Sequence, residues 1–186
     1  MALTPSNDLP LGTPAPAFSL PDVAGKTHTL ADFSGPILVV FICNHCPFVK
    51  HLKKEFAQFA REYTAKGLGV IAICSNDEKE YPEDSLANMG KDAKTFGYVF
   101  PYIQDRSQSV ARAYRAACTP DFFLYDRDHK LFYHGQFDDS RPNNGKPVTG
   151  ADLRAAADAV LKGDQPPAKQ TPSIGCNIKW MAGNPL

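Results

Sequence analysis

The chain has 186 residues, of which 43% are hydrophobic and 22% are charged, a composition typical of one globular domain. Twenty basic residues balance twenty acidic ones, so the charge gives no reason to expect nucleic acid or an anionic membrane as a partner. The longest apolar run, residues 37–42, is far shorter than the roughly 20 residues that cross a bilayer, so no membrane-spanning segment is expected.

The N-terminus and the cysteine count both indicate a reducing compartment. Residues 1–8 lack the basic cluster and apolar stretch of a secretory signal, which predicts a cytoplasmic protein. Five cysteines stand at positions 43, 46, 74, 118 and 176, and this odd number argues against a disulfide scaffold. A close cysteine pair in such a protein more often serves redox or metal chemistry.

The first half of the chain predicts a hairpin and then a strand–helix–strand unit. Residues 17–20 and 27–30 form two short strands around a turn at 21–26. Residues 37–42 are apolar at every position, the pattern of a strand buried on both faces. Apolar residues then recur every three or four positions, predicting a helix from Pro47 that is capped near Gly67. A parallel strand over 68–74 completes the unit.

The second half predicts helices over 85–96, 107–117 and 151–161, with an antiparallel pair of strands over 122–125 and 130–137. Residues 163–172 hold three prolines and form an extended connector. In the last stretch Ile174, Cys176, Ile178 and Trp180 alternate with small or polar residues, which predicts a tail docked on the body. We expect one α/β domain over 1–162, a central mixed sheet flanked by helices with an N-terminal hairpin, and a docked tail over 163–186.

The segment Cys43-Asn44-His45-Cys46 carries the clearest chemical signal, because it places a C-x-x-C pair at a strand-to-helix junction. A helix N-terminus offers unpaired N–H groups and partial positive charge, which favour a thiolate, and the thiolate is the form that attacks a disulfide. We expect Cys43 to be the exposed attacking thiolate and Cys46 the buried resolving thiol in the first helical turn. A cationic His45 would favour the thiolate further.

A metal site is the alternative interpretation of this segment. Cys43, His45 and Cys46 could supply ligands, but zinc usually takes four, often from a second close pair, and the chain has none. A non-catalytic metal or copper binder that adds a distant histidine such as His134 therefore stays as an alternative. Thiol–disulfide exchange itself needs no metal and no bound cofactor.

Cys118-Thr119-Pro120 precedes a predicted strand about 75 residues after the pair. An X-Pro bond adopts the cis form at low cost, and a cis bond here would turn a backbone edge outward to pair with a substrate. The alternative is an ordinary trans proline at the start of a strand, where its missing N–H is tolerated.

Together these motifs resemble the thioredoxin superfamily, and in particular its redoxin branch, which is AhpC/TSA-like. The resemblance is greatest to the peroxiredoxin-like thioredoxin family proteins and covers nearly the whole chain, through residues 43–49, 75–77, 81–85, 118–122, 138–142 and 175–180. It implies the thioredoxin fold and exchange through Cys43 and Cys46, supported by Asn44, His45, Thr119 and Pro120. The implied partners are protein or small-molecule disulfides and thiols, with electrons from a thiol donor or another redox protein.

Departures from the family patterns refine this expectation. The buried aspartate of thioredoxin is replaced by Ile37, and the residues between the cysteines are Asn44 and His45, which by analogy with bacterial disulfide oxidants predicts a more oxidising pair. The reactive cysteine of peroxiredoxins aligns with Cys46. The threonine and arginine that activate peroxide there are Cys43 and Pro120 here, so a thiol peroxidase is the second alternative.

The remaining candidates are weaker. Cys74 is expected to be a small core residue, and Arg141 to form a salt bridge within its loop. If the tail passes the proline loop, Cys118 and Cys176 could form a second redox pair. The alternative is that Cys176 only contributes to the apolar stripe.

Overall fold

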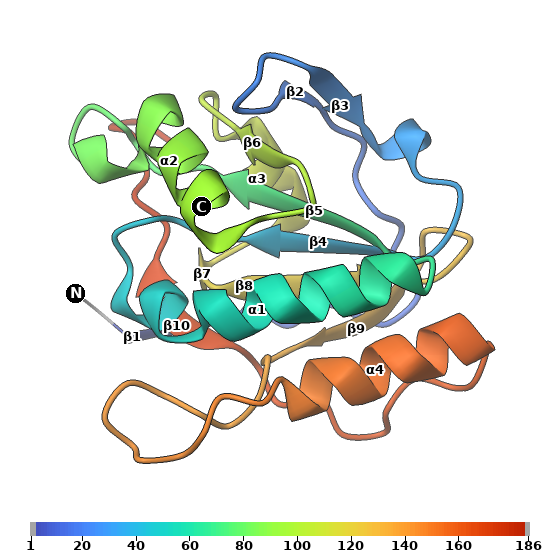
Figure 1. Ribbon diagram of the computed structural model, residues 1–186. Coiled ribbons are helices and arrows are strands. Elements are labelled where there is room, and N and C mark those ends of the chain that lie inside the picture. The colour runs from blue at the N-terminus through green and yellow to red at the C-terminus, as the bar shows by residue number, and fades with distance from the viewer. Residues whose placement is uncertain (1–2, 185–186) are drawn as a thin grey trace.

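The computed structural model describes residues 3–184. A five-stranded mixed sheet forms its centre, in the order β6-β5-β4-β8-β9 (Figure 1). Strands β4, β5 and β6 run parallel to one another, β8 runs antiparallel to β4, and β9 runs antiparallel to β8. Their bounds are β4 Ile37–Phe41, β5 Gly69–Cys74, β6 Tyr102–Gln104, β8 Asp121–Tyr125 and β9 Leu131–Gly135.

All five side chains of β4 are apolar, which suits a strand in the middle of the sheet, and all five are fully buried there. Leu38 and Val40 project to the face covered by α1 Pro47–Ala65, α2 Leu86–Phe96 and α4 Ala151–Lys162. The alternate residues of β4 project to the other face, which packs against α3 Ser109–Tyr114. The core therefore has two layers, one on each side of the sheet.

Two smaller sheets complete the fold. The hairpin of β2 Ser19–Pro21 and β3 Thr27–Thr29 is followed by the short 3₁₀ helix η1 Leu30–Asp32. A three-stranded sheet joins distant parts of the chain, with β10 Ile174–Asn177 lying between β1 Leu3–Pro5 and β7 Cys118–Thr119. A second 3₁₀ helix, η2 Pro82–Asp84, precedes α2.

The predicted α/β architecture is confirmed, with local differences. Strand β6 was not predicted, because three residues are too few to show a period. The helix predicted over 107–117 is only α3, since Arg115 adopts the left-handed conformation (φ 53°) that ends it. The strand predicted over 130–137 ends at Gly135.

The tail docks as predicted, although its apolar stripe is incomplete. Cys176 and Ile178 are 3% and 1% exposed, whereas Ile174 is 38% exposed. Ile174 pairs with Pro5 at the outer end of the small sheet, where nothing covers it completely. The tail is therefore buried mainly at Ser173 and over residues 175–179.

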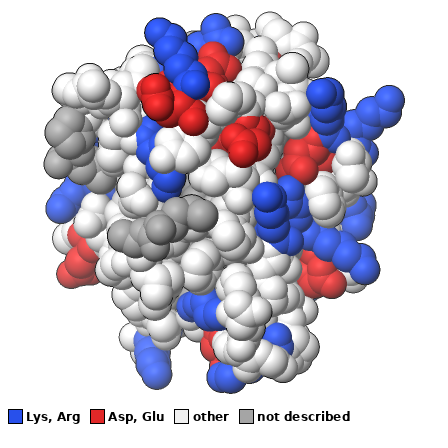
Figure 2. Space-filling view, turned by 90° about the vertical axis from the view of Figure 1, so that its left-hand side faces the viewer, with Lys and Arg blue, Asp and Glu red and all other residues white. Residues whose placement is uncertain are grey.

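No helix among residues 3–184 is long and apolar enough to cross a membrane. Figure 2 turns the left-hand side of Figure 1 toward the viewer, and acidic and basic side chains are interspersed there with wide uncharged areas. On this face the described acidic and basic residues therefore lie intermixed.

Candidate redox site

Cys43 and Cys46 lie between the end of β4 and the start of α1. Cys46 is the N-cap residue of α1, with extended backbone angles, and Pro47 is the first helical residue. Both cysteines are buried, with 1% and 0% of their surface exposed. The prediction that Cys43 is exposed is therefore wrong. The prediction that Cys46 lies inside the first turn is also wrong, because the helix begins one residue after Cys46.

The bond between Thr119 and Pro120 is cis, as predicted. Thr119, on the N-terminal side of that bond, contacts both cysteines: its Oγ1 lies 3.4 Å from Sγ of Cys43, and its carbonyl oxygen lies 3.2 Å from Sγ of Cys46. The proline loop and the cysteine pair thus form one site.

The tail contributes a third cysteine to this site. Cys176 stands opposite Thr119 in the small sheet, and its Sγ lies 2.9 Å from Sγ of Cys46. Cys118 stands opposite Asn177, so its side chain projects to the other face of the sheet from that of Cys176. The predicted pairing of Cys118 with Cys176 is therefore wrong; Sγ of Cys118 instead lies 3.5 Å from the carbonyl oxygen of Pro120.

A buried carboxylate, Asp84, holds the turn between the two cysteines. It accepts hydrogen bonds from the backbone N–H of Asn44 (2.7 Å), from Nδ1 of His45 (2.7 Å) and from the side-chain amide of Asn76 (2.7 Å). Burial alone would raise the pKa of Asp84, but the hydrogen bonds from His45 and Asn76 lower it overall. We did not identify Asp84 as a site residue from the sequence, although it lies in one of the family-like motifs, residues 81–85.

Asn44 and His45 anchor the same turn. The amide of Asn44 donates to the carbonyl oxygen of Glu83 (2.8 Å) and accepts from the hydroxyl of Tyr102 (3.1 Å). The ring of His45 stacks on Tyr81 at 4.9 Å between centroids. His45 therefore faces Asp84 and Tyr81, and the predicted direct role of its charge on the thiolate stays a prediction.

The surroundings of the two sulfurs favour a thiolate at Cys46. Hydrogen bonding to Cys43 contributes most to lowering the pKa of Cys46 to about 5; burial opposes it, while hydrogen bonds from Cys176 and the backbone N–H of Val49 add to it. For Cys43 the hydrogen bond to Cys46, burial and the negative charge of Asp84 all raise the pKa well above its usual value. This reverses the acidity predicted for the pair.

The thiolate absorbance of the reduced protein should therefore titrate with a midpoint near pH 5, being present at neutral pH and lost as the pH falls through 5. Cys43→Ala should raise that midpoint, because it removes the largest cause of the lowered pKa. Cys118→Ala is the matched control and should leave the midpoint unchanged. An absorbance that rises only around the ordinary cysteine pKa of about 8.5 would contradict the assignment.

One set of potential metal ligands coincides with the site. Ligand atoms of Cys43, His45 and Asp84 all lie within 4.8 Å of one another. Among the described residues the set has no fourth ligand of the kind usual for structural zinc. The carboxylate also already accepts two hydrogen bonds from the turn, from Asn44 and His45, and one from Asn76. His134, the histidine suggested from the sequence, lies elsewhere and contacts Asp121 at 2.9 Å.

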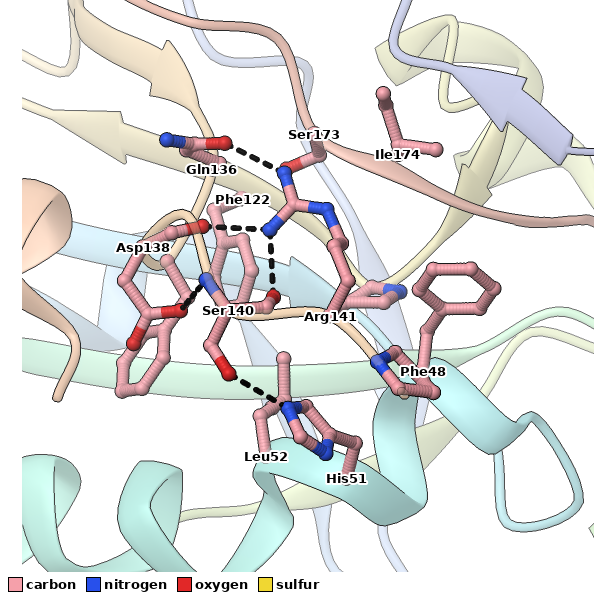
Figure 3. A pocket seen from close by; sticks show the side chains of 13 residues that line it. Phe48, His51, Leu52, Phe122, Gln136, Asp138, Ser140, Arg141, Ser173 and Ile174 are labelled. Carbon is pink, nitrogen blue, oxygen red and sulfur yellow. Dashed lines mark hydrogen bonds between the residues drawn. The ribbon is translucent and has the colours of Figure 1, made fainter. Parts of the chain in front are cut away.

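A pocket adjoins the site on the side of Pro120 and Ile174 (Figure 3). Phe48 and Leu52 of α1 line it, together with Arg141. The guanidinium of Arg141 donates to the carbonyl oxygens of Asp138 (2.6 Å) and Ser140 (2.7 Å) and to Oε1 of Gln136 (2.5 Å). Arg141 thus holds its loop through neutral oxygens and not through the predicted salt bridge.

Known proteins were compared with this chain at the levels of family, sequence and structure. The profile of the AhpC/TSA family matches residues 11–134. The thiol–disulfide oxidoreductase ResA of Geobacillus thermodenitrificans is 28% identical over 65% of the chain; the match spans 66% of that relative, just under two thirds of its length. A Mycobacterium tuberculosis protein provisionally named a peroxiredoxin is 32% identical over 61% of the chain and 69% of its own length.

Solved structures extend the likeness to nearly the whole chain. A hypothetical protein from Sinorhizobium meliloti is 59% identical, with a TM-score of 0.95 over 97% of this chain and 100% of its own. A thioredoxin family protein from Chlorobium tepidum is 20% identical, with a TM-score of 0.63 over 83% of this chain and 99% of its own. The latter likeness identifies the fold as the thioredoxin fold, which confirms the prediction.

Proposed function

Because the chain belongs to the AhpC/TSA family of oxidoreductases, we propose that it is a thiol–disulfide oxidoreductase whose redox pair is Cys43 and Cys46. The observation that supports this best is the contact of both sulfurs with Thr119, next to the cis bond to Pro120. A low-pKa cysteine at a helix N-terminus and a second thiol three residues away together suit exchange through a mixed disulfide.

In the proposed reaction, the Cys46 thiolate attacks one sulfur of a substrate disulfide. The substrate S–S bond breaks, one substrate thiolate leaves and takes up a proton, and a mixed disulfide forms on Cys46. Cys43 then loses its proton and attacks the Cys46 sulfur, which releases the second substrate thiol. The substrate is reduced by two electrons and the pair becomes a disulfide, which a thiol donor or another redox protein reduces again.

The electrostatics of the site fit these roles. Cys46 is the thiol whose pKa is lowered, so at neutral pH it is the nucleophile. The hydrogen bond to Cys46, burial and the charge of Asp84 together raise the pKa of Cys43, which keeps it protonated until the mixed disulfide has formed. We therefore propose Cys46 as the attacking cysteine and Cys43 as the resolving one, the reverse of the assignment made from the sequence.

A thiol peroxidase is the second candidate. The lowered pKa of Cys46 favours it, because a thiolate is also the form that peroxide oxidises. Against it stand Cys43 and Pro120 at the positions of the residues that activate peroxide in peroxiredoxins, so we expect weak peroxidase activity.

Parallel assays on the full chain test the proposal. With a dithiol as electron donor, the protein should turn over a model disulfide, and in each cycle Cys43 and Cys46 should form a disulfide that the donor then reduces. In the same buffer, dilute peroxide should oxidise Cys46 slowly, and metal analysis of the purified protein should find no stoichiometric metal. Rapid single-turnover oxidation of Cys46 by peroxide, without disulfide turnover, would instead establish the peroxidase.

A further inference from the structure

The backbone edge beside the cis bond is already occupied by the protein's own tail. Strand β10 lies beside β7 (Figure 1) and pairs antiparallel with it. Cys176 stands directly opposite Thr119 in this pairing. An extended peptide that adds to an exposed strand edge is a common mode of substrate recognition. In this protein β10 lies where such a peptide would bind, and Cys176 lies where a cysteine of a bound substrate peptide would meet the redox pair.

Close packing of the two strands brings Cys176 onto the redox pair. A Cβ atom added at Gly175 would lie 2.0 Å from the carbonyl oxygen of Thr119, so the absence of a side chain there permits the approach. Beyond β10, the backbone N–H of Lys179 donates to Oδ1 of Asn76 at 2.8 Å. The tail is thus held on both sides of Cys176, and its Sγ lies 2.9 Å from that of Cys46.

We propose that Cys176 is a third redox cysteine, an internal thiol that exchanges with the Cys43–Cys46 disulfide and takes Cys46 into a Cys46–Cys176 disulfide. The inference rests on the proposed function, because it needs that first disulfide as its reactant. The Cys176 thiol loses its proton and attacks the sulfur of Cys46. The Cys43–Cys46 bond breaks, the Cys46–Cys176 bond forms, and Cys43 leaves as a thiolate that takes up the proton. No electrons enter or leave the protein.

The exchange would change what the oxidised protein can bind. A Cys46–Cys176 bond ties β10 covalently to the start of α1, beside Thr119, so the edge that a substrate peptide would use stays closed. Cys43 becomes a thiol again and can reverse the exchange by attacking Cys46. The oxidised protein would therefore exist in two forms. In one, Cys43 and Cys46 form the disulfide and the tail is not covalently bonded to the pair; in the other, the Cys46–Cys176 disulfide bonds the tail to it.

Peptide mapping of the intact chain tests this directly. The reduced protein is oxidised with glutathione disulfide, quenched with acid, alkylated and digested without reduction. We expect Cys46 to be recovered in two peptide pairs, with Cys43 and with Cys176. Cys176→Ser should give the Cys43 pair alone, and Cys118→Ser, a matched control for a buried thiol on the neighbouring strand, should give both.

The variant Cys43→Ser isolates the new step, because glutathione disulfide then places glutathione on Cys46 and only Cys176 lies beside that sulfur. We expect Cys176 to displace the glutathione and form the Cys46–Cys176 bond. In Cys43→Ser/Cys176→Ser the release of glutathione should be about a hundredfold slower, because the neighbouring thiol is gone.

The two proposals fail in different ways. If the wild-type chain forms the Cys43–Cys46 disulfide but always yields Cys176 as a thiol, and Cys43→Ser keeps its glutathione, this inference is wrong and the proposed function stands. If no Cys43–Cys46 disulfide forms and the dithiol assay shows no turnover, the proposed function is wrong.

Discussion

Replacing Cys46 with serine should lower turnover of a model disulfide by at least about a thousandfold, because a hydroxyl does not attack disulfides at neutral pH. The lowered pKa of Cys46 makes it the principal thiolate of the site at neutral pH. Initial rates with a dithiol donor measure the effect, and the thiolate absorbance with a midpoint near pH 5 should disappear in the same variant.

Cys118→Ser provides the control for this experiment. Its sulfur is as buried as that of Cys46 but lies near the carbonyl oxygen of Pro120 and the hydroxyl of Ser6, where a serine can also be accommodated. We expect this variant to retain turnover. A Cys46→Ser protein that still reduces the model disulfide would show that Cys43 attacks alone and would return the roles to those expected from the sequence.

Gly175→Ala should increase the alkylation rate of Cys46 on the order of a hundredfold, because it forces β10 away from the pair. The added Cβ would meet backbone atoms, Thr119 O at 2.0 Å and Thr119 C at 2.6 Å, which cannot move aside as a flexible side chain could. The cysteines that are 1% and 0% exposed in the closed structure would then be reached by reagent. Alkylation of the reduced protein, followed by mass spectrometry of the peptides, measures the rate.

Gly90→Ala is the matched control. The same substitution in α2 places a Cβ 3.7 Å from the nearest atom, the Cβ of Val23, which is an ordinary van der Waals contact without a clash. Its alkylation rate should equal that of the wild type. Equal rates for Gly175→Ala as well would mean that β10 does not restrict access to the pair, and substrate would then reach Cys46 without movement of the tail.

The parts of the fold and site that the sequence predicted are those with local signals. Continuous apolar residues identified β4, and a three-to-four-residue period identified α1. The C-x-x-C spacing and the Thr119-Pro120 dipeptide are visible without any knowledge of tertiary contacts. Their meeting follows from strand order, because β8 pairs beside β4 and brings the residues before Asp121 to the end of β4.

The parts that could not be predicted depend on long-range register. A shift of one residue in the register of β10 would turn Cys176 away from Cys46. That register depends on the close approach of Gly175 to the backbone of Thr119 and on the hydrogen bond from the N–H of Lys179 to Asn76. The acidity of the pair was predicted wrongly for a related reason. The raised pKa of Cys43 depends first on its hydrogen bond to Cys46 and on burial, and then on Asp84. The helix η2 brings Asp84 to this turn from forty residues beyond Asn44, as the 2.7 Å hydrogen bond from the N–H of Asn44 shows.

The small sheet of β1, β10 and β7 also affects how the protein folds. Leu3 stands opposite Cys176, so the strands that cover the pair close nearly the longest loop available in the chain. Closing such a loop costs more conformational entropy than forming the neighbouring strand–helix–strand unit, and contacts of this separation form slowly. We therefore expect Cys43 and Cys46 to be assembled at the start of α1 before β10 docks. During that interval oxidants and thiols of other unfolded chains can reach Cys43 and Cys46. The extent to which the pair reacts with them therefore depends on how fast β10 docks.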